Sequence, residues 1–419
     1  MHSITAVRRL HGLDTLRAAA IILVVLYHTT INVTFKPSFG PFGTLGWAGV
    51  DLFFVLSGYL IGNQIFAAFA RGERFSLARF YARRALRTLP NFYVVLTLYF
   101  CLPLVLGGTP PPSLWRFVSF TQNVGLHPGT AFSHAWSLCI EEQFYVMLPI
   151  IALLVGWSRS IRLGWVILIG AMAAAAMLRY WLWRQYGGDG AAYYQHIYYA
   201  SWCRFDELLP GVALALIKNF HAATWQRLIA AGNRTLCAGL ASTLLTLFLF
   251  LNFHAQEPDG YRLWMSVVGY PMLACSFALL TLAALSPNSW LARCRIPGAG
   301  SLALWSYAIY LTHKAVMHVL KTNFIAHGYD ASAPLSLAVM LGSSVIVGWL
   351  LYTLVETPFM NLRERWFGTH QSAPLTRDRI QVAAQISDGT PTLYPCTPSM
   401  PSTVSIAQSS SDSTDSAIT

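Results

Sequence analysis

The sequence predicts an all-α polytopic membrane protein, a bundle of about ten transmembrane helices with both termini in the cytoplasm. Of the 419 residues, 55% are apolar and only 11% are charged, whereas a soluble chain carries roughly 25% charged residues. The net charge of +11 would indicate a nucleic-acid partner in a soluble protein. Here the basic residues lie in short segments between apolar runs. We therefore expect a lipid bilayer around the chain and no nucleic-acid partner.

Ten apolar runs are predicted to be membrane-spanning helices. They cover residues 18–35, 49–68, 88–107, 137–156, 163–183, 206–219, 235–253, 263–285, 301–324 and 335–355. The sixth run is short for a bilayer of about 30 Å, so we expect it to be tilted, re-entrant or sheltered by its neighbours. With the N-terminus placed in the cytoplasm, most Lys and Arg residues fall on the cytoplasmic side. That asymmetry predicts an even number of spans.

The composition divides the chain into two parts. Residues 1–360 hold the apolar runs and form the predicted transmembrane domain. Residues 361–419 follow the last apolar run, and beyond about residue 369 they are rich in Ser, Thr and Pro. We expect residues 361–419 to form a disordered cytoplasmic tail. The seven cysteines show no metal-ligand spacing, and His127 and His134 have no suitably spaced partners. The sequence therefore predicts no metal site.

Two ionisable residues share one face of the first apolar helix. His28 follows Arg17 by eleven residues, which is roughly three turns and about 16 Å at 1.5 Å per residue. An ionisable residue at that depth is costly and indicates a functional site. The alternative is that His28 only hydrogen-bonds a neighbouring helix. Asp14 lies three residues before Arg17 and can pair with it on the same face.

A basic segment precedes the third predicted span. Arg79, Arg83 and Arg87 share one helical face, and Arg84 forms an R-x-x-R pair with Arg87. Basic residues at the end of a span are ordinarily topology signals or contacts to lipid headgroups. Guanidinium groups also bind phosphate bidentately, so the same density suits a phosphate-rich ligand. The residues alone leave both interpretations open.

The second and fourth spans begin with polar residues. Asp51 lies near the outer end of the second span, where it can pair with a cation or orient an imidazole. Ser57 and Gly58 are small residues that permit close helix packing. In the fourth span, Glu141 and Glu142 point about 100° apart. They therefore cannot form an acid–base dyad, and we expect one of them to face the bundle interior.

The second half of the chain offers fewer candidates. Arg204 and Asp206 precede the sixth span and are predicted to form an exposed ion pair of little energetic value. Tyr310 and His313 share a face of the ninth span, where a structural hydrogen bond and a catalytic role are both open. Glu356 precedes Pro358 by two residues, which predicts the end of the tenth helix.

Seven motifs in this order cover residues 12–360. They are Leu13-Asp14-x-x-Arg17 with His28, the run from Gly49 to Tyr59, Arg79-x-x-x-Arg83-Arg84-x-x-Arg87, Trp136-Ser137 with Glu141-Glu142, Arg204-x-Asp206, Ser306-Tyr307 with Tyr310 and His313, and Glu356-x-Pro358. With these motifs the chain resembles the integral-membrane acyltransferase family 3, whose members O-acylate extracytoplasmic sugars and related acceptors. Each motif alone is weak, but seven in order are specific.

The resemblance implies a membrane O-acyltransferase in the inner (cytoplasmic) membrane of a bacterium. It implies that cytoplasmic acyl-CoA, with acetyl as the expected acyl group, is the donor and that no cofactor is bound. The acceptor is then a hydroxyl of an extracytoplasmic or membrane-associated carbohydrate. His28 and Arg17 are implied to be essential, with Arg84 and Arg87 in the donor site. We expect Arg79 and Arg83 to assist them. The expected supporting residues are Asp14, Asp51, Ser57, Trp136, Glu141, Glu142, Arg204, Asp206, Tyr310 and His313.

Two mechanisms and one rival class remain open at this point. A neutral His28 either deprotonates the acceptor hydroxyl as general base or accepts the acyl group itself. Asp51 or Glu141 is the expected residue that orients its ring. The rival is a multi-pass transporter, because intramembrane His and Arg also serve proton-coupled flux. A structural scaffold would leave the buried histidine and the basic segment unexplained.

Overall fold

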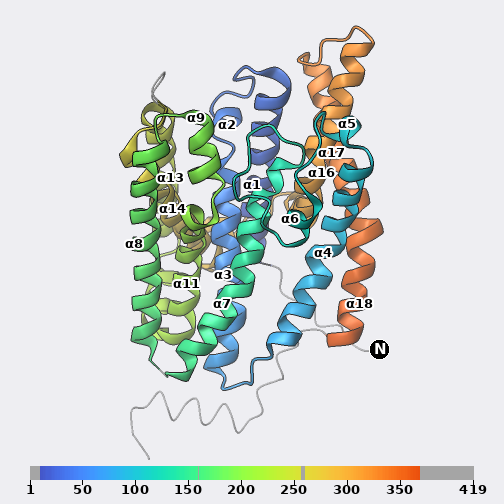
Figure 1. The fold of residues 1–419 in the computed structure, drawn as a ribbon. Helices are drawn as coiled ribbons and strands as arrows, with labels where there is room; N and C mark the ends of the chain where they lie inside the picture. Colours follow the sequence, from blue (N-terminus) through green and yellow to red (C-terminus); the bar gives the residue numbers. More distant parts are fainter. Residues whose placement is uncertain (1–9, 159, 256–259, 369–419) are drawn as a thin grey trace, which may run out of the picture. The chain divides into compact units, whose positions relative to one another are not determined.

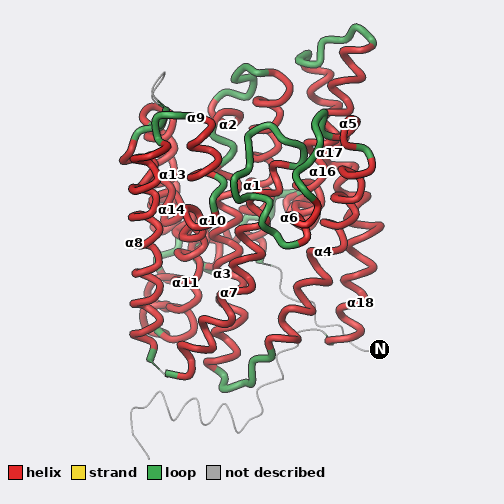
Figure 2. The backbone as a smooth tube through the Cα atoms, viewed as in Figure 1, coloured by secondary structure: helices red, strands yellow, loops and turns green. Residues whose placement is uncertain are grey.

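The computed structural model describes residues 10–158, 160–255 and 260–368. Within these residues the secondary structure is helical, and the one β-bridge joins Ala255 and Tyr261 (Figure 2). The predicted all-α class is confirmed. A disordered tail was predicted for residues 361–419. Residues 361–367 are helical instead. Residues 369–419 lie outside the described residues.

Among the described residues, seven helical segments are long and apolar enough to cross a membrane. They are His11–Thr34, Ala48–Ala70, Ser133–Trp157, Ile161–Tyr186, Asn233–Phe253, Met265–Leu285 and Pro334–Phe367. This number supports the predicted polytopic membrane class. The other three predicted ranges, 88–107, 206–219 and 301–324, are also largely helical but are not among the seven. The count of ten spans and the cytoplasmic position of the termini stay predictions.

The long helices alternate in direction between two ends of the bundle (Figure 1). The first group runs upward in that view and consists of α1 (His11–Thr29), α4 (Leu77–Cys101), α8 (Ile161–Tyr186), α13 (Asn233–Phe253) and α16 (Ala299–Ala326). The second group returns and consists of α3 (Ala48–Ala70), α7 (Trp136–Trp157), α11 (Leu209–Phe220), α14 (Tyr270–Leu285), α17 (Pro334–Leu351) and α18 (Thr357–Phe367). We call the end at which α1 begins the lower end and the opposite end the upper end.

Short helices and turns complete the chain. They are α2 (Pro41–Thr44), α5 (Pro103–Leu106), α6 (Leu114–Val118), α9 (Gly190–Tyr193), α10 (Ser201–Arg204), α12 (Ala222–Ala230) and α15 (Trp290–Arg293). Turns of π or 3-10 geometry cover Thr30–Thr34, Ser133–Ala135, Tyr194–Tyr198, Phe205–Leu208, Met265–Gly269 and Tyr352–Glu356. The predicted helix end at Glu356 is wrong. The π turn continues α17 into α18, and Pro358 stands in the helix directly after that turn. The irregular hydrogen bonding of a π turn lets the helix pass a residue that lacks a backbone N–H.

The short sixth segment is sheltered by its neighbours, one of the arrangements expected for it. Helix α11 has 12 residues and packs closely against α3. A Cβ atom on Gly58 of α3 would lie 2.0 Å from the carbonyl oxygen of Leu208, and one on Gly211 of α11 would lie 2.1 Å from that of Val55. Glycine at both positions lets the two backbones touch. The predicted packing role of Gly58 is confirmed.

We predict that Gly58→Ala destabilises the bundle. The added methyl group must displace the backbone at Leu208, which should cost about 1–3 kcal/mol. The matched control is Gly170→Ala on α8, where no atom lies within 4 Å of the new Cβ and alanine favours the helix by about 0.5–1 kcal/mol. Thermal unfolding in detergent should show a lower midpoint for the first variant and an unchanged or higher one for the second. Equal midpoints would contradict the close approach.

Candidate active site

Three histidines from three elements meet inside the bundle. His28 lies at the end of α1, His134 lies in the turn before α7, and His313 lies in the middle of α16. The ring centroids of His28 and His313 are 4.8 Å apart, and those of His134 and His313 are 5.2 Å apart. His134 and His313 are buried, whereas His28 is half-buried. In the described part of the chain, no group of His, Cys, Asp or Glu side chains forms a candidate metal site.

The hydrogen bonds of His313 decide the protonation pattern of His28. The Nδ1 atom of His313 lies 3.0 Å from the carbonyl oxygen of Ile309 and 2.8 Å from that of Tyr310. Carbonyl oxygens only accept, so this nitrogen carries the proton, and Nε2 of the neutral ring is an acceptor. His28 Nδ1 lies 2.9 Å from that Nε2 and must donate to it. The Nε2 atom of His28 therefore keeps its lone pair, and no described residue hydrogen-bonds to it.

The ring of His28 is thus held by His313. The two carboxylates predicted to orient it, Asp51 and Glu141, make other contacts, so that prediction is wrong. Glu141 accepts a hydrogen bond from Ser57 Oγ at 3.0 Å and another from the Tyr145 hydroxyl at 2.8 Å. Asp51 pairs with a cation, which is the other role considered for it. A histidine partner requires α16 to pack against α1, and the sequence does not show that packing.

Tyr310 and His134 complete the surroundings of the cluster. The Tyr310 hydroxyl donates to the backbone carbonyl of His134 and lies 2.6 Å from Ser137 Oγ. His134 Nε2 lies 3.3 Å from the carbonyl oxygen of Leu311, whereas its buried Nδ1 has no partner among the described residues. From the sequence alone, His134 is only a histidine without suitably spaced zinc ligands. Its position two residues before an apolar helix is the signal that could have placed it with His28.

Three arginines approach one another in the lower half of the bundle. Arg17 of α1 lies within electrostatic range of Arg84 and Arg87 of α4. The Arg84 guanidinium lies 3.6 Å from the centroid of the Tyr145 ring, and its Nε atom lies 4.0 Å from Glu142. Arg17 and Arg87 form no hydrogen bond or ion pair with any described residue. The Glu356 carboxylate lies within electrostatic range of both, but it accepts its hydrogen bond from Asn91. Guanidinium groups that no carboxylate binds directly are suited to an anionic ligand.

The side chains of Arg79 and Arg83, which were also predicted to bind the donor, make their hydrogen bonds away from Arg17, Arg84 and Arg87. The guanidinium groups of Arg79 and Arg83 bind carbonyl oxygens at the C-terminus of α18, with Arg83 Nη1 2.9 Å from that of Gly368. Cations stabilise that end of a helix. The predicted pair of Asp14 and Arg17 is not formed within 4 Å. Such a pair is worth only about 0.2–0.5 kcal/mol, too little to fix both side chains. The adjacent carboxylates separate as expected, Glu141 toward α3 and Glu142 toward Arg84.

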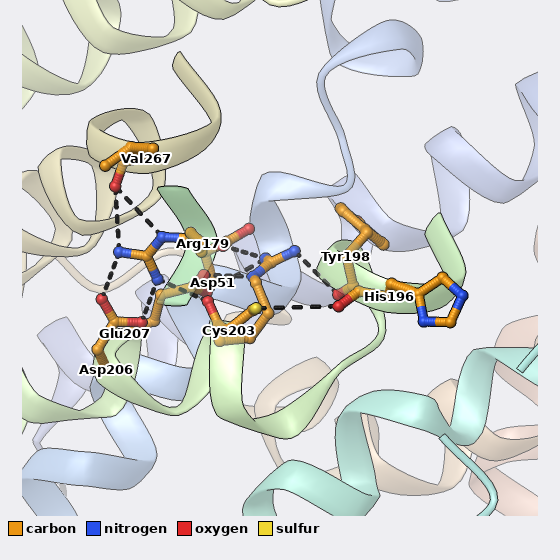
Figure 3. Close-up of polar contacts among 9 residues, drawn as sticks. Asp51, Arg179, His196, Tyr198, Cys203, Asp206, Glu207 and Val267 are labelled. Atoms are coloured by element: carbon orange, nitrogen blue, oxygen red, sulfur yellow. Dashed lines mark hydrogen bonds and ion pairs between the residues drawn. The ribbon is translucent and has the colours of Figure 1, made fainter. Parts of the chain in front are cut away.

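A buried ionic network joins α3 and α8 to the chain that leads into α11 (Figure 3). Arg204 Nη2 lies 2.7 Å from Asp51 Oδ1, and Arg204 Nε binds Glu207. All three side chains are fully buried. The Arg204 guanidinium also lies 4.1 Å from the Tyr270 ring centroid and 5.3 Å from that of Trp136. Aromatic faces stabilise a desolvated cation. Trp136 therefore packs on the network next to the start of α7.

The second arginine of the network joins the broken helices around α10. Arg179 of α8 binds Asp206 bidentately at 2.7 and 2.8 Å. It also donates to the backbone carbonyls of Cys203 at 2.6 Å and Val267 at 3.1 Å. The predicted exposed pair of Arg204 and Asp206 is wrong, because both are fully buried and each binds a different partner. Residues two apart on a helical backbone point about 200° apart, so they face opposite neighbours.

The fold and the site define a polytopic helical membrane protein that holds a neutral imidazole with an unprotonated Nε2 atom in its interior. The sequence matches the Acyltransferase domain family over residues 10–353. The chain belongs to this family of acyltransferases. The match favours an enzyme and does not favour the transporter alternative.

Two curated relatives extend the comparison. The chain is 31% identical over 380 residues to YrhL of Bacillus subtilis (strain 168), whose name as a peptidoglycan O-acetyltransferase is provisional, with 84% of this chain and 55% of the relative covered. It is 27% identical over 377 residues to the peptidoglycan O-acetyltransferase OatA of Listeria monocytogenes, with 83% of this chain and 55% of that relative covered. The chain thus spans about half the length of these relatives. No solved structure matches it.

We predict that Arg204→Met destabilises the fold strongly. The substitution leaves Asp51 and Glu207 buried without their cation, and breaking a buried pair in this way costs about 3–5 kcal/mol. The control is Arg71→Met, which breaks the exposed 2.6 Å pair with Glu73 and should cost less than about 1 kcal/mol. The yield and unfolding midpoint of the detergent-purified proteins measure the difference. Similar losses for both variants would mean that the buried network does not hold the bundle.

Proposed function

We propose that the protein is a membrane O-acetyltransferase that moves an acetyl group from acetyl-CoA to a hydroxyl group of a carbohydrate acceptor. Family membership and the similarity to peptidoglycan O-acetyltransferases support this reaction class. The single observation that carries the proposal is the unprotonated Nε2 atom of His28, whose lone pair is free to accept a proton. It is oriented by His313 and has no partner in the described part of the chain.

The donor is proposed to enter from the lower end, which faces the cytoplasm of the bacterial inner membrane in this proposal. The asymmetry of Lys and Arg supports that orientation. The guanidinium groups of Arg17 and Arg87 make no direct hydrogen bond to a described residue, and with Arg84 beside them they are suited to the phosphates of acyl-CoA. Arg17 and His28 lie on the same face of α1, about 16 Å apart along its axis. The pantetheine arm would follow this face and carry the thioester to His28.

The reaction then needs one proton transfer at His28. The acceptor hydroxyl gives its proton to Nε2 while its oxygen attacks the thioester carbonyl. The carbon–sulfur bond breaks, and the CoA thiolate leaves and takes up the proton from the imidazolium. The hydrogen bond from His28 Nδ1 to His313 keeps the ring in the required tautomer. The products are the acetylated acceptor and free CoA.

The same geometry supports a route through an acetyl-histidine. In that route Nε2 attacks the thioester carbonyl and the CoA thiolate leaves. The acceptor oxygen then attacks the acetyl carbonyl, the bond between that carbon and Nε2 breaks, and the hydroxyl proton passes to the thiolate. The two routes differ in one observable. Labelled acetyl stays on the protein in the absence of an acceptor only if His28 is the nucleophile.

We predict that His28→Ala lowers acetyl transfer by about 10²–10⁴-fold, the usual contribution of a general base. The control is His327→Ala, because His327 lies exposed near the end of α16. Transfer of labelled acetyl from acetyl-CoA to a muramoyl glycan measures the rate for the purified protein in nanodiscs. A wild-type rate in His28→Ala would refute the catalytic role of this residue.

We predict that Arg84→Ala combined with Arg87→Ala raises the KM for acetyl-CoA by about tenfold or more, since each lost charge-assisted hydrogen bond is worth about 1.5–3 kcal/mol. The KM for the acceptor should change little. The control is Arg162→Ala, which removes an exposed arginine from the start of α8 at the same end of the bundle. An unchanged KM for acetyl-CoA in the double variant would contradict the donor site and leave both arginines as topology signals.

A further inference from the structure

A small cavity lies on the upper side of the histidine cluster. Its volume is about 110 Å³, and Asn32, Phe132, Lys314 and Lys321 are among its lining residues. A single water molecule needs about 10–15 Å³ of such volume. The cavity therefore has room for a chemical group of several heavy atoms.

Each of the three elements that supply a histidine also lines this cavity. Asn32 follows His28 by one turn, and its side chain donates to the His28 carbonyl at 2.7 Å. Lys314 directly follows His313 on α16, which rises toward the upper end. Phe132 precedes His134 on the chain that descends into α7. In all three elements, the residue that lines the cavity lies closer to the upper end than the histidine does. The cavity and the arginines of the lower half therefore lie on opposite sides of His28.

The cavity holds two cations without a counter-charge. Lys314 Nζ lies 3.3 Å from Ser133 Oγ, and Lys321 Nζ lies 2.7 Å from the carbonyl oxygen of Asn32. Both contacts are to neutral oxygens. Neither lysine forms an ion pair with the described residues, and the lining contains no carboxylate. Two ammonium groups on the lining of one small cavity attract an anion, and the more deeply placed Lys314 is costly to leave unpaired.

We infer that this cavity binds an anionic group of the carbohydrate acceptor, a carboxylate or a phosphate, and thereby brings a nearby hydroxyl to His28. The inference rests on the proposed function, since it assigns the upper side of His28 to the acceptor. The arginines of the lower half already supply the cations that the donor phosphates require. The lysines of the cavity are therefore assigned to the second substrate. They make the enzyme selective for charged sugars, because a neutral acceptor leaves both ammonium groups unpaired.

Equilibrium binding tests the inference without any donor. The probes are a muramoyl disaccharide with a free carboxylate, its neutral methyl ester, and N-acetylglucosamine 1-phosphate, each titrated into the full chain in nanodiscs. We expect the wild type to bind the carboxylate or the phosphate at least about tenfold more tightly than the ester, as a charge-assisted contact provides. Lys321→Gln should lose this preference, and Lys321→Arg should keep it. Lys36→Gln removes an exposed lysine at the same end and should bind as the wild type does.

The three probes separate the possible outcomes. Tighter binding of the disaccharide acid identifies a carboxylate acceptor, and tighter binding of the sugar phosphate identifies a phosphorylated one. Equal binding of acid and ester, no binding of any probe, or an unchanged preference in Lys321→Gln would overturn the inference. Acetyl-CoA turnover is measured on the same preparations. Turnover without a charge preference would refute the acceptor site alone, whereas a charge preference without turnover would count against the proposed reaction.

Discussion

The structure depends on a constraint of the membrane interior, where no water is present to satisfy a broken helix or a charge. The chain between α9 and α11 breaks its helix several times, and two buried arginines meet the resulting need. Arg179 binds the carbonyls of Cys203 and Val267, and Arg204 lies 3.4 Å from that of Tyr198. Carboxylates from the same region and from α3 balance their charge. This network ties α3 and α8 to the turn that leads into α11, and its aromatic contact with Trp136 fixes the start of α7.

Cations in this protein fall into two groups that differ in their partners. Arg179 and Arg204 have every charge compensated by the protein, so their role is structural. Arg17 and Arg87 form no direct hydrogen bond or ion pair with the described residues, although Glu356 lies within electrostatic range of both, and Lys321 contacts only neutral oxygen and an aromatic face. A protein keeps a cation that no carboxylate binds directly inside a membrane bundle at a cost, which a ligand can offset. These cations lie on both sides of His28, so the histidine cluster lies between the two regions that we propose to bind anionic groups of the donor and the acceptor.

The sequence predicted the helical class and the position of most helices because hydropathy reports burial in lipid directly. It also identified Arg17 and His28 as a pair on one face. It missed the contacts made across helices, since the His28–His313 hydrogen bond joins residues that only tertiary packing brings together. The prediction of an exposed pair at Arg204 and Asp206 was wrong because neighbouring helices cover this polar segment. The polarity of the segment itself gives no sign of that burial. Arg179 was overlooked although it stands in a 26-residue apolar helix, a pattern that indicates a function or a buried partner.

We propose that an acyl donor from the lower end meets the lone pair of His28. A cryo-electron microscopy structure with acetonyl-CoA, a ketone analogue of acetyl-CoA that carries a methylene group between the sulfur and the carbonyl, is the most direct test of this proposal. We expect the nucleotide phosphates beside Arg17, Arg84 and Arg87. We expect the carbonyl carbon of the analogue about 3–3.5 Å from His28 Nε2, as a near-attack geometry requires. An analogue whose phosphates occupy the upper cavity, or whose acyl end lies away from His28, would contradict it.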